Sequence, residues 1–334
     1  MAKLLRRAAL SLGLLLTFGV PAEAQWTWTP QTGRWVNMKK LPKETPELQI
    51  EHARALMLEG QHKKALAETR KFTSFYGESD MADQNQFLRG EIRMAQGQYM
   101  DAAKEFQQVL SAYPDTELYD EAIKRQYAIG DSLYDEGQKR QEKRWAFYKK
   151  RPLKRAAEVY GMVVENQPFT AAAAEAQYKI GLSHYARKEY VNAAFEYQRV
   201  VEDYPGSDWV DEASYGLAMC YYNRARPPAY DQGPSRQAID AVDTFAVRFP
   251  GDSRVAELQE KRGEMVERIA EQRLQTARFY EKRRMFKSAR IYYELIVDQF
   301  GGTSAAQTAQ SWLDGRPADE PNARQQVIPL KSAS

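Results

Sequence analysis

The sequence of 334 residues has one cysteine and three histidines, which leaves little material for metal or redox chemistry. Cys220 has no partner for an intramolecular disulfide and is expected to be a buried thiol. His52, His62 and His184 do not stand at metal-ligand spacing from one another or from a carboxylate. No glycine-rich nucleotide loop and no G-x-S-x-G nucleophile elbow is present. We therefore predict a protein that is not an enzyme and that needs no cofactor.

Long apolar runs are also scarce, and the one that exists lies at the start of the chain. Basic residues in the first seven positions precede an apolar run over residues 8–20, and Ala22-Glu23-Ala24 follows it. This order predicts a signal peptide over residues 1–24, cleaved before Gln25, because the run is too short to span a bilayer comfortably. A net charge of +3 gives no global field. The mature protein is thus expected in the periplasm.

What the sequence does contain is an internal repeat with a fixed offset. Six times an alanine is followed twelve residues later by a proline or glycine, at Ala65–Gly77, Ala102–Pro114, Ala156–Pro168, Ala193–Pro205, Ala238–Pro250 and Ala289–Gly301. Aromatic residues stand four positions after four of these alanines, at Phe106, Tyr160, Tyr197 and Tyr293. That spacing places alanine and aromatic side chain on one helix face. The closing proline or glycine then ends the helix.

A second set of small residues indicates a partner helix in each repeat. Counting back 24 residues from the closing residue gives Ala53, Gly90, Gly181 and Ala277. Small residues at one point on each of two helices allow the helices to approach closely. Each repeat is therefore predicted to be helix A, a short turn, helix B and a stop.

This pattern resembles the tetratricopeptide repeat, a pair of antiparallel helices that stacks on its neighbours. It predicts an all-α solenoid of about six helix pairs with a capping helix over residues 303–313 and Trp312 as the lid. The run 255–282 has only Gly263 as a breaker and is expected to form one long helix. Residues 224–235 carry two proline-containing dipeptides and are expected to form a loop.

The remaining segments complete the expected domain organisation. Residues 25–45 are rich in tryptophan and proline and are expected to be an extended lead-in. Trp26, Trp28 and Trp35 either dock onto the first repeat or contact a membrane or partner. Residues 46–168 form the N-terminal repeats, 169–314 the C-terminal repeats, and 315–334 a disordered tail.

One segment concentrates positive charge, over residues 139–155 in repeat three. It holds nine basic residues against one acidic residue, with aromatic side chains between them. We interpret it as an insertion that the repeat does not need for packing, and two interpretations stay open: a solvated helical extension, or a patch for anionic lipid or a partner. Nucleic acid is not an expected partner of an exported protein. The candidate residues are Lys139, Arg140, Lys143, Arg144, Trp145, Lys149, Lys150 and Arg151.

From Thr170 to Trp312 the chain resembles the BamD family, the tetratricopeptide component of the machine that inserts β-barrels into the bacterial outer membrane. The stretches that carry the resemblance are AEAQYKIGLSHYARKEYVNAAFEYQRVVEDYPGSDWVDEASYGLAMCYYNRA, DQGPSRQAIDAVDTFAVRFPGDSRVAE and RLQTARFYEKRRMFKSARIYYELIVDQF. The loop before helix B of repeat five and the long helix leading to Phe279-Tyr280 are shared features. The resemblance implies a periplasmic scaffold, peripheral to the outer membrane, that binds unfolded outer-membrane clients and a barrel-forming partner.

Two departures from that family stand out. Its members are lipid-anchored through a cysteine after the signal peptide, whereas Gln25 follows Ala24 here. The family often has an arginine where this chain has Tyr292, so docking onto the barrel protein is expected to differ. Candidates for the client-binding groove and partner contact are Tyr178, Tyr185, Tyr221, Tyr222, Arg224 and Tyr292, each of which packing also explains. The alternative function is a periplasmic adaptor for cell-envelope or cell-division machinery.

Overall fold

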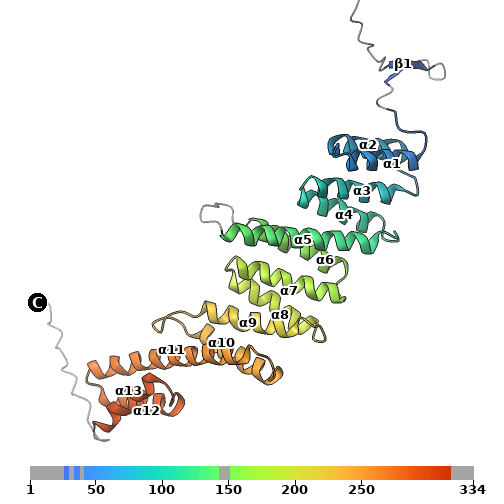
Figure 1. The fold of residues 1–334 in the computed structure, drawn as a ribbon. Helices are drawn as coiled ribbons and strands as arrows, with labels where there is room; N and C mark the ends of the chain where they lie inside the picture. Colours follow the sequence, from blue (N-terminus) through green and yellow to red (C-terminus); the bar gives the residue numbers. More distant parts are fainter. Residues whose placement is uncertain (1–25, 30–33, 38–40, 143–150, 317–334) are drawn as a thin grey trace, which may run out of the picture. The chain divides into compact units, whose positions relative to one another are not determined.

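The computed structural model describes residues 26–29, 34–37, 41–142 and 151–316 (Figure 1). The chain divides into two compact units, Met1–Ala122 and Ile123–Ser334. The described residues form thirteen α-helices and one short β-hairpin. Consecutive helices pack against each other in pairs, as the repeat pattern predicts. The fold is the all-α tetratricopeptide-repeat solenoid expected from the sequence.

The first unit contains the hairpin and two complete helix pairs. Its elements are β1 Trp26–Thr29, β2 Arg34–Asn37, α1 Pro46–Leu58, α2 His62–Tyr76, α3 Ala82–Ala95 and α4 Tyr99–Ala112. The strands are antiparallel with Trp28 opposite Trp35, so the lead-in is a hairpin where we expected a plain extended segment. Its aromatic, threonine and valine residues favour strands. Of its tryptophan side chains only Trp28 is described, and it is 48% exposed.

The second unit contains the longer helices. Its elements are α5 Tyr119–Glu142, which begins in the first unit, α6 Arg151–Asn166, α7 Ala171–Ala186, α8 Tyr190–Asp203, α9 Val210–Arg224, α10 Gly233–Arg248, α11 Val255–Lys282, α12 Phe286–Gln299 and α13 Ser304–Asp314. The expected 28-residue helix is confirmed in α11. The expected loop separates α9 from α10, but it is shorter than 224–235: Gly233-Pro234, expected outside a helix, begin α10, since proline is tolerated in the first helical turn. Figure 1 shows α11 running past both of these helices.

The repeated alanines and aromatic residues form the core, as predicted. The six alanines are at most 2% exposed, and Phe106, Tyr160, Tyr197 and Tyr293 are also at most 2% exposed. The small residues explain how such large rings fit. A Cβ atom built on Gly90 would lie 2.6 Å from the Phe106 ring, and one on Gly181 would lie 2.6 Å from the Tyr197 ring. Glycine is needed at these positions because no side chain carbon can approach that closely.

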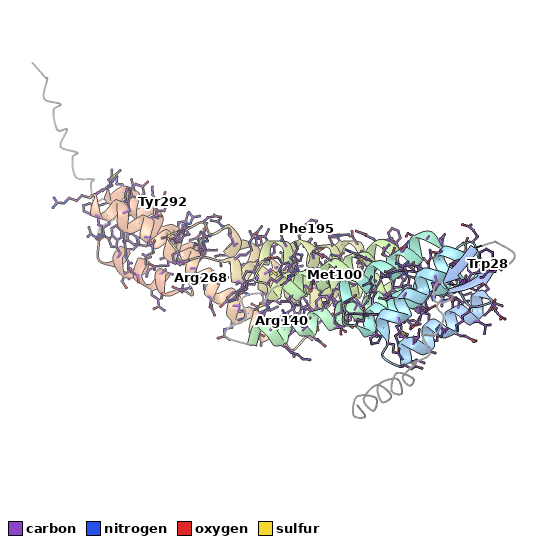
Figure 2. The ribbon with its side chains drawn as sticks, turned by 90° about the horizontal axis from the view of Figure 1, so that it is seen from above. Trp28, Met100, Arg140, Phe195, Arg268 and Tyr292 are labelled. Carbon is purple, nitrogen blue, oxygen red and sulfur yellow. The ribbon has the colours of Figure 1, made fainter. Side chains whose placement is uncertain are left out.

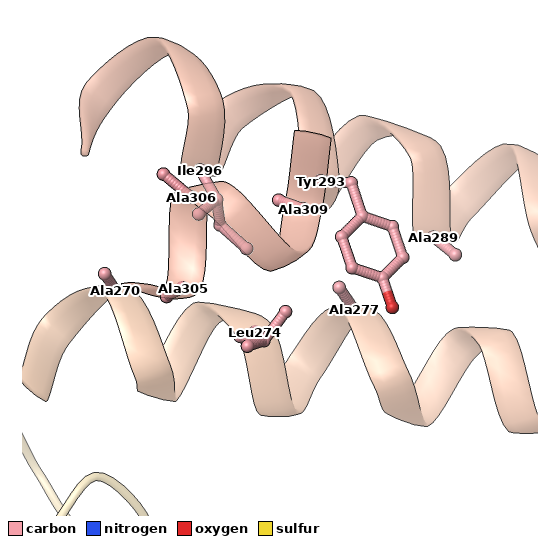
Figure 3. Packing of buried hydrophobic residues seen from close by; sticks show 9 residues of the cluster. All are labelled: Ala270, Leu274, Ala277, Ala289, Tyr293, Ile296, Ala305, Ala306 and Ala309. Atoms are coloured by element: carbon pink, nitrogen blue, oxygen red, sulfur yellow. The ribbon is translucent and has the colours of Figure 1, made fainter. Parts of the chain in front are cut away.

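The last repeat closes on a capping helix, which confirms the prediction for residues 303–313. Thr303 caps α13 by accepting a hydrogen bond from the backbone amide of Ala306. Figure 3 shows the Tyr293 ring on α12 directed at α11, beside Ala277. The Trp312 ring stacks on Tyr293 with centroids 4.3 Å apart, and its indole NH donates to Glu281 Oε1 over 2.8 Å. Trp312 is thus the lid that the sequence predicts.

The segment 139–155 differs in part from its expected role. Its first residues complete α5 and its last residues begin α6, where Leu153 is fully buried. A Cβ atom on Gly137 of α5 would lie 2.5 Å from Leu153 Cγ. The repeat therefore does use residues 151–155 for packing, because they supply the first turn of an amphipathic helix. Residues 143–150, the predicted signal peptide and the tail after Arg316 lie outside the described residues.

Candidate binding surfaces

The first helices of successive pairs in the second unit, α5, α7, α9 and α11, are joined by polar contacts that we call the A-helix ladder. Lys179 Nζ lies 2.7 Å from Asp131 Oδ1, which links α7 to α5. The amide of Asn223 on α9 donates to the Tyr185 hydroxyl on α7 over 3.0 Å. Tyr222 on α9 donates to Glu264 Oε2 on α11 over 2.7 Å. The ladder gives this row of helices a surface of aromatic and charged groups.

Arg254, immediately before α11, contacts side chains of both α9 and α10. Its guanidinium donates to Asp252 over 2.6 Å and pairs with Glu212 on α9 over 2.8 Å. It also lies over the rings of Tyr215 and Phe245, 5.0 and 5.6 Å from their centroids. The hydrogen bonds from Arg254 lower the pKa of the Asp252 carboxyl to about 2. The residue therefore fixes the start of α11 against α9 and α10.

Three of the predicted groove residues belong to one packed cluster around Tyr197. Tyr178 stacks on Trp209 with centroids 5.0 Å apart, and Tyr185 meets Tyr190 edge-on at 5.3 Å. Tyr221 packs against the same cluster. Burial raises the pKa of all three phenols, most strongly that of Tyr178. Their rings hold α7, α8 and α9 together, and each is only partly accessible.

Of the other three predicted residues, Arg224 lies at the edge of this cluster, and Tyr222 and Tyr292 lie outside it. Tyr222 faces α11, where Lys261 Nζ lies 4.6 Å from its ring centroid. Its hydrogen bond to Glu264 raises the pKa of its phenol. Arg224 ends α9 with its guanidinium 5.8 Å from the Tyr221 ring. Tyr292 on α12, which Figure 2 labels, stacks on Tyr280 of α11 with ring centroids 5.3 Å apart and planes 14° apart. The six candidates therefore do not converge on a single pocket.

A hollow in the second unit lies between α8, α9 and α10, and we call it the α8–α10 groove. Its volume is about 300 Å³. Its floor is apolar and comes from three helices, with Val201 on α8, Leu217 and Tyr221 on α9, and Ala241, Phe245 and Phe249 on α10 or just after it. Its rim is polar and includes Gln198, Gln237, Asp240, Thr244 and Arg248. Phe195, on the exposed side of α8, is 63% accessible (Figure 2).

Only the edges of the basic segment are described. Lys139 and Arg140 lie in the last turn of α5, where Arg140 pairs with Glu136, and Arg151 begins α6 with its side chain exposed. Lys143, Arg144, Trp145, Lys149 and Lys150 fall outside the described residues. The patch consequently remains a prediction from the sequence.

Within the described ranges, no group of three histidine, cysteine, aspartate or glutamate side chains is placed to hold a metal ion. Cys220 is fully buried in α9, and burial raises the pKa of its thiol to about 12. This confirms the expected core thiol. No helix among the residues described is long and apolar enough to cross a bilayer.

The sequence also holds contacts that its repeat pattern did not reveal. Buried glutamines in three A helices donate to a glutamate on the following B helix, always 19 residues later: Gln49 to Glu68, Gln86 to Glu105 and Gln177 to Glu196. Each glutamine stands four residues before the small residue of its repeat, and each glutamate three after the alanine. The ladder has a similar regularity. Tyr215 donates to Glu257 and Tyr222 to Glu264, and each glutamate follows its tyrosine by 42 residues.

Two protein-family models match this chain. The family model YfiO, described as outer membrane lipoprotein, matches residues 131–313. A tetratricopeptide repeat model matches residues 84–116 in the first unit. A search of curated proteins returns no match. The first match begins within α5 and ends within α13, so it includes the ladder and the α8–α10 groove.

Solved structures similar to this chain are tetratricopeptide repeat proteins. One from Parabacteroides merdae is 14% identical over 80% of this chain and 97% of its own, with a TM-score of 0.31. TTC0263 from Thermus thermophilus is 13% identical over 66% of this chain and 99% of its own, with a TM-score of 0.31. The C-terminal part of a Cytophaga hutchinsonii repeat protein is 18% identical over 80% and 88%, with a TM-score of 0.34. At these identities the similarity concerns the fold alone.

Proposed function

This chain belongs to the YfiO family of outer membrane lipoproteins, and from that membership we propose that it is a non-enzymatic scaffold for the assembly of β-barrel proteins in the outer membrane. Tetratricopeptide repeats are protein-interaction modules, so binding other polypeptides is the general function of the fold. The observation that carries the specific proposal is the family match, which extends over more than half of the chain and over every helix pair from α7 to α12.

The A-helix ladder is the surface that we assign to client segments. It presents partly accessible tyrosines next to charged groups, as at Tyr222, Lys261 and Glu264. Such amphipathic side chains can contact extended segments that alternate apolar and polar residues. The last repeat, with Tyr292 stacked on Tyr280, is the surface assigned to the barrel-forming partner.

Photocrosslinking in cells tests both assignments. A photoreactive residue at Tyr222 is expected to capture unfolded outer-membrane clients, and one at Tyr292 a barrel-assembly protein. Val247 on α10 is 84% exposed and lies on neither surface, so it serves as the matched control position. Capture of the same proteins at Val247 as at Tyr222, or of peptidoglycan enzymes at Tyr292, would contradict the assignment.

The basic segment 139–155 is the surface that we assign to contact with the membrane. Gln25, and not a cysteine, follows the predicted signal peptide, and the side chain of Cys220 is buried. We propose that the basic side chains contact anionic headgroups, where each one near the surface contributes about 1 kcal/mol.

Charge reversal tests this attachment. Replacing Lys139, Arg140, Lys149 and Lys150 by glutamate is expected to move the protein from the membrane to the soluble fraction. The control replaces four basic residues of the first unit whose side chains are exposed, Lys63, Lys64, Arg70 and Lys104. Equal membrane association of both variants and the unaltered chain would exclude the basic segment as the tether.

A further inference from the structure

The α8–α10 groove is an apolar surface for which the described residues provide no cover. Its floor includes the side chains of Val201, Leu217 and Ala241, and these are only partly buried. At about 300 Å³ it has the size of a small ligand site. Exposed apolar hollows of this kind mark places where another segment binds.

The rim of the groove carries an acidic group that is available for a partner. Asp240 is exposed, and among the residues described its carboxylate takes part in no ion pair. Arg248 at the other end donates to the Pro205 carbonyl and lies over the Phe249 ring, 5.5 Å from its centroid. An occupant with branched apolar side chains and a basic residue beside them would complement both the floor and Asp240.

We propose that the occupant is the chain's own C-terminal segment 324–331, which lies outside the described residues. Its sequence, RQQVIPLK, is the only run of branched apolar residues after Arg316. Val327, Ile328 and Leu330 supply the apolar side chains, and Arg324 precedes them while Lys331 follows. The rest of residues 317–334 is polar or small, so no other part of that segment matches the floor.

The intervening chain is long enough to reach α10, one of the helices that line the groove. Arg316 lies beside Glu281 near the end of α11, with its guanidinium 3.5 Å from the carboxylate. Arg262, nineteen residues earlier on α11, pairs with Asp243 of α10 over 2.7 Å. That stretch of helix is about 28 Å long at 1.5 Å per residue. Val327 follows Arg316 by eleven residues, which span up to about 36–40 Å when extended.

Because the segment is covalently attached to the rest of the chain, it can occupy the groove even if its intrinsic affinity for the groove is low. A short flexible connection gives an effective concentration on the order of millimolar, so an interaction too weak to hold a free peptide can still keep the groove occupied. The proposal concerns an intramolecular contact and does not depend on the proposed role in barrel assembly.

Photocrosslinking in the purified full chain tests this contact. A benzoylphenylalanine at Thr244, on the rim, is expected to crosslink to residues 324–331 within one molecule. The control position is Ile291 on α12, which is 63% exposed. It follows Arg290, whose guanidinium donates to the Arg316 carbonyl over 2.9 Å. A tail that samples the surface without preference would therefore reach Ile291 at least as often as Thr244.

Two variants and one labelling scheme make the outcome decisive. Replacing Val327, Ile328 and Leu330 by aspartate should reduce the Thr244 crosslink at least tenfold, and deleting residues 317–322 should abolish it because the segment then falls short. Mixing ¹⁴N- and ¹⁵N-labelled protein separates crosslinks within one molecule from those between molecules. Equal yield at Ile291, crosslinks only between molecules, or no crosslink at Thr244 would each overturn the proposal.

Hydrogen exchange gives an independent readout that needs no photoreactive group. Ending the chain after Arg316 should increase exchange in peptides that contain Gln198 and Thr244, while α5 and α6 stay unchanged. Identical exchange in the two chains would contradict occupation of the groove by the tail.

Discussion

Single residues set the distance between helices in this protein. The Tyr197 ring lies between two glycines, because a Cβ atom on Gly181 of α7 or on Gly216 of α9 would lie 2.6 or 2.7 Å from it. Tyr160 has the same relation to Gly130, at 2.5 Å. An aromatic ring on one helix thus packs against a glycine on the next, in place of a contact between two medium-sized side chains. The same aromatic–glycine pairing recurs in several repeats.

The sequence predicts the rings and only some of the glycines. Counting back 24 residues from the closing residue works where the turn between helices is short, as for Gly90 and Gly181. In repeat three the same count falls on Arg144 and in repeat five on Arg226, because both repeats carry extra residues between their helices. Gly130 and Gly216 were missed for that reason. A fixed 24-residue count does not locate the small residue in a repeat that has an insertion between its two helices.

Replacing Gly181 by alanine is expected to lower the free energy of unfolding by about 1–3 kcal/mol, because the added methyl overlaps the Tyr197 ring. Chemical denaturation followed by circular dichroism measures the change. The control is Gly161→Ala in α6, where a Cβ atom meets nothing within 4 Å. That substitution should raise stability by about 0.5–1 kcal/mol through helix propensity. Equal effects of the two substitutions would contradict the proposed steric fit between Gly181 and the Tyr197 ring.

Acid sensitivity is expected from Asp252, whose carboxyl pKa Arg254 lowers to about 2. Because this pKa is below the unfolded value of about 3.9, the stabilisation is complete above about pH 4 and disappears as pH falls towards 2. Asp252→Asn should therefore unfold more easily than the unaltered chain at pH 7, with the difference vanishing near pH 2. Thermal melts across this range test it, with Asp208→Asn, at an exposed carboxylate outside the groove, as the control. A difference independent of pH would refute the ion-pair explanation.

At the scale of whole elements, the long helix and the cap were predictable and the turns less so. The bounds of α11 follow from an uninterrupted run, and α13 follows from Thr303 and the apolar residues after it. The short turn within four of the helix pairs contains one residue with positive φ. Gly60 and Gly97 supply it in the first unit, whereas Lys188 and Arg284 adopt φ of 62° and 58° at the equivalent places. Neither lysine nor arginine favours positive φ, so the sequence did not predict this backbone conformation at Lys188 or Arg284.

Relieving that strain should stabilise the turn between α7 and α8. Lys188→Gly is expected to raise the free energy of unfolding by about 0.5–1 kcal/mol, since a non-glycine residue in the left-handed region costs about 1–2 kcal/mol. Arg236→Gly in the exposed part of α10 should lower it by about 1 kcal/mol. Urea titration compares them. A loss of stability in Lys188→Gly would mean that its side chain contributes more than its backbone conformation costs.

The cap should control the stability of the last repeat. Trp312→Ala removes the stack on Tyr293 and the hydrogen bond to Glu281, and we expect a local loss of about 2–3 kcal/mol. This lies below the about 3–5 kcal/mol of a fully buried tryptophan because Trp312 is only partly buried. Hydrogen exchange should increase in α12 and α13 and stay unchanged in α1 to α4, since each repeat contacts only its neighbours. A uniform increase along the chain would contradict a solenoid.

For the whole molecule, the sequence predicted the fold class, the helix pairs and the family, since all three depend on local periodicity. It did not locate a binding surface. The six candidate residues were chosen for their residue types, and the structure distributes them over one packed cluster, a ladder contact and the last repeat. The α8–α10 groove depends on three helices that meet only after folding, so no spacing in the sequence indicates it.

The central claim is that this repeat protein serves outer-membrane barrel assembly, and depletion of the chain from its own cells tests it most directly. The measurement is the amount of folded barrel protein in the outer membrane, read from its resistance to unfolding in detergent before heating. We predict that folded barrels decline as the chain is depleted and recover when it is supplied again. Unchanged levels of folded barrels after complete depletion would contradict the claim.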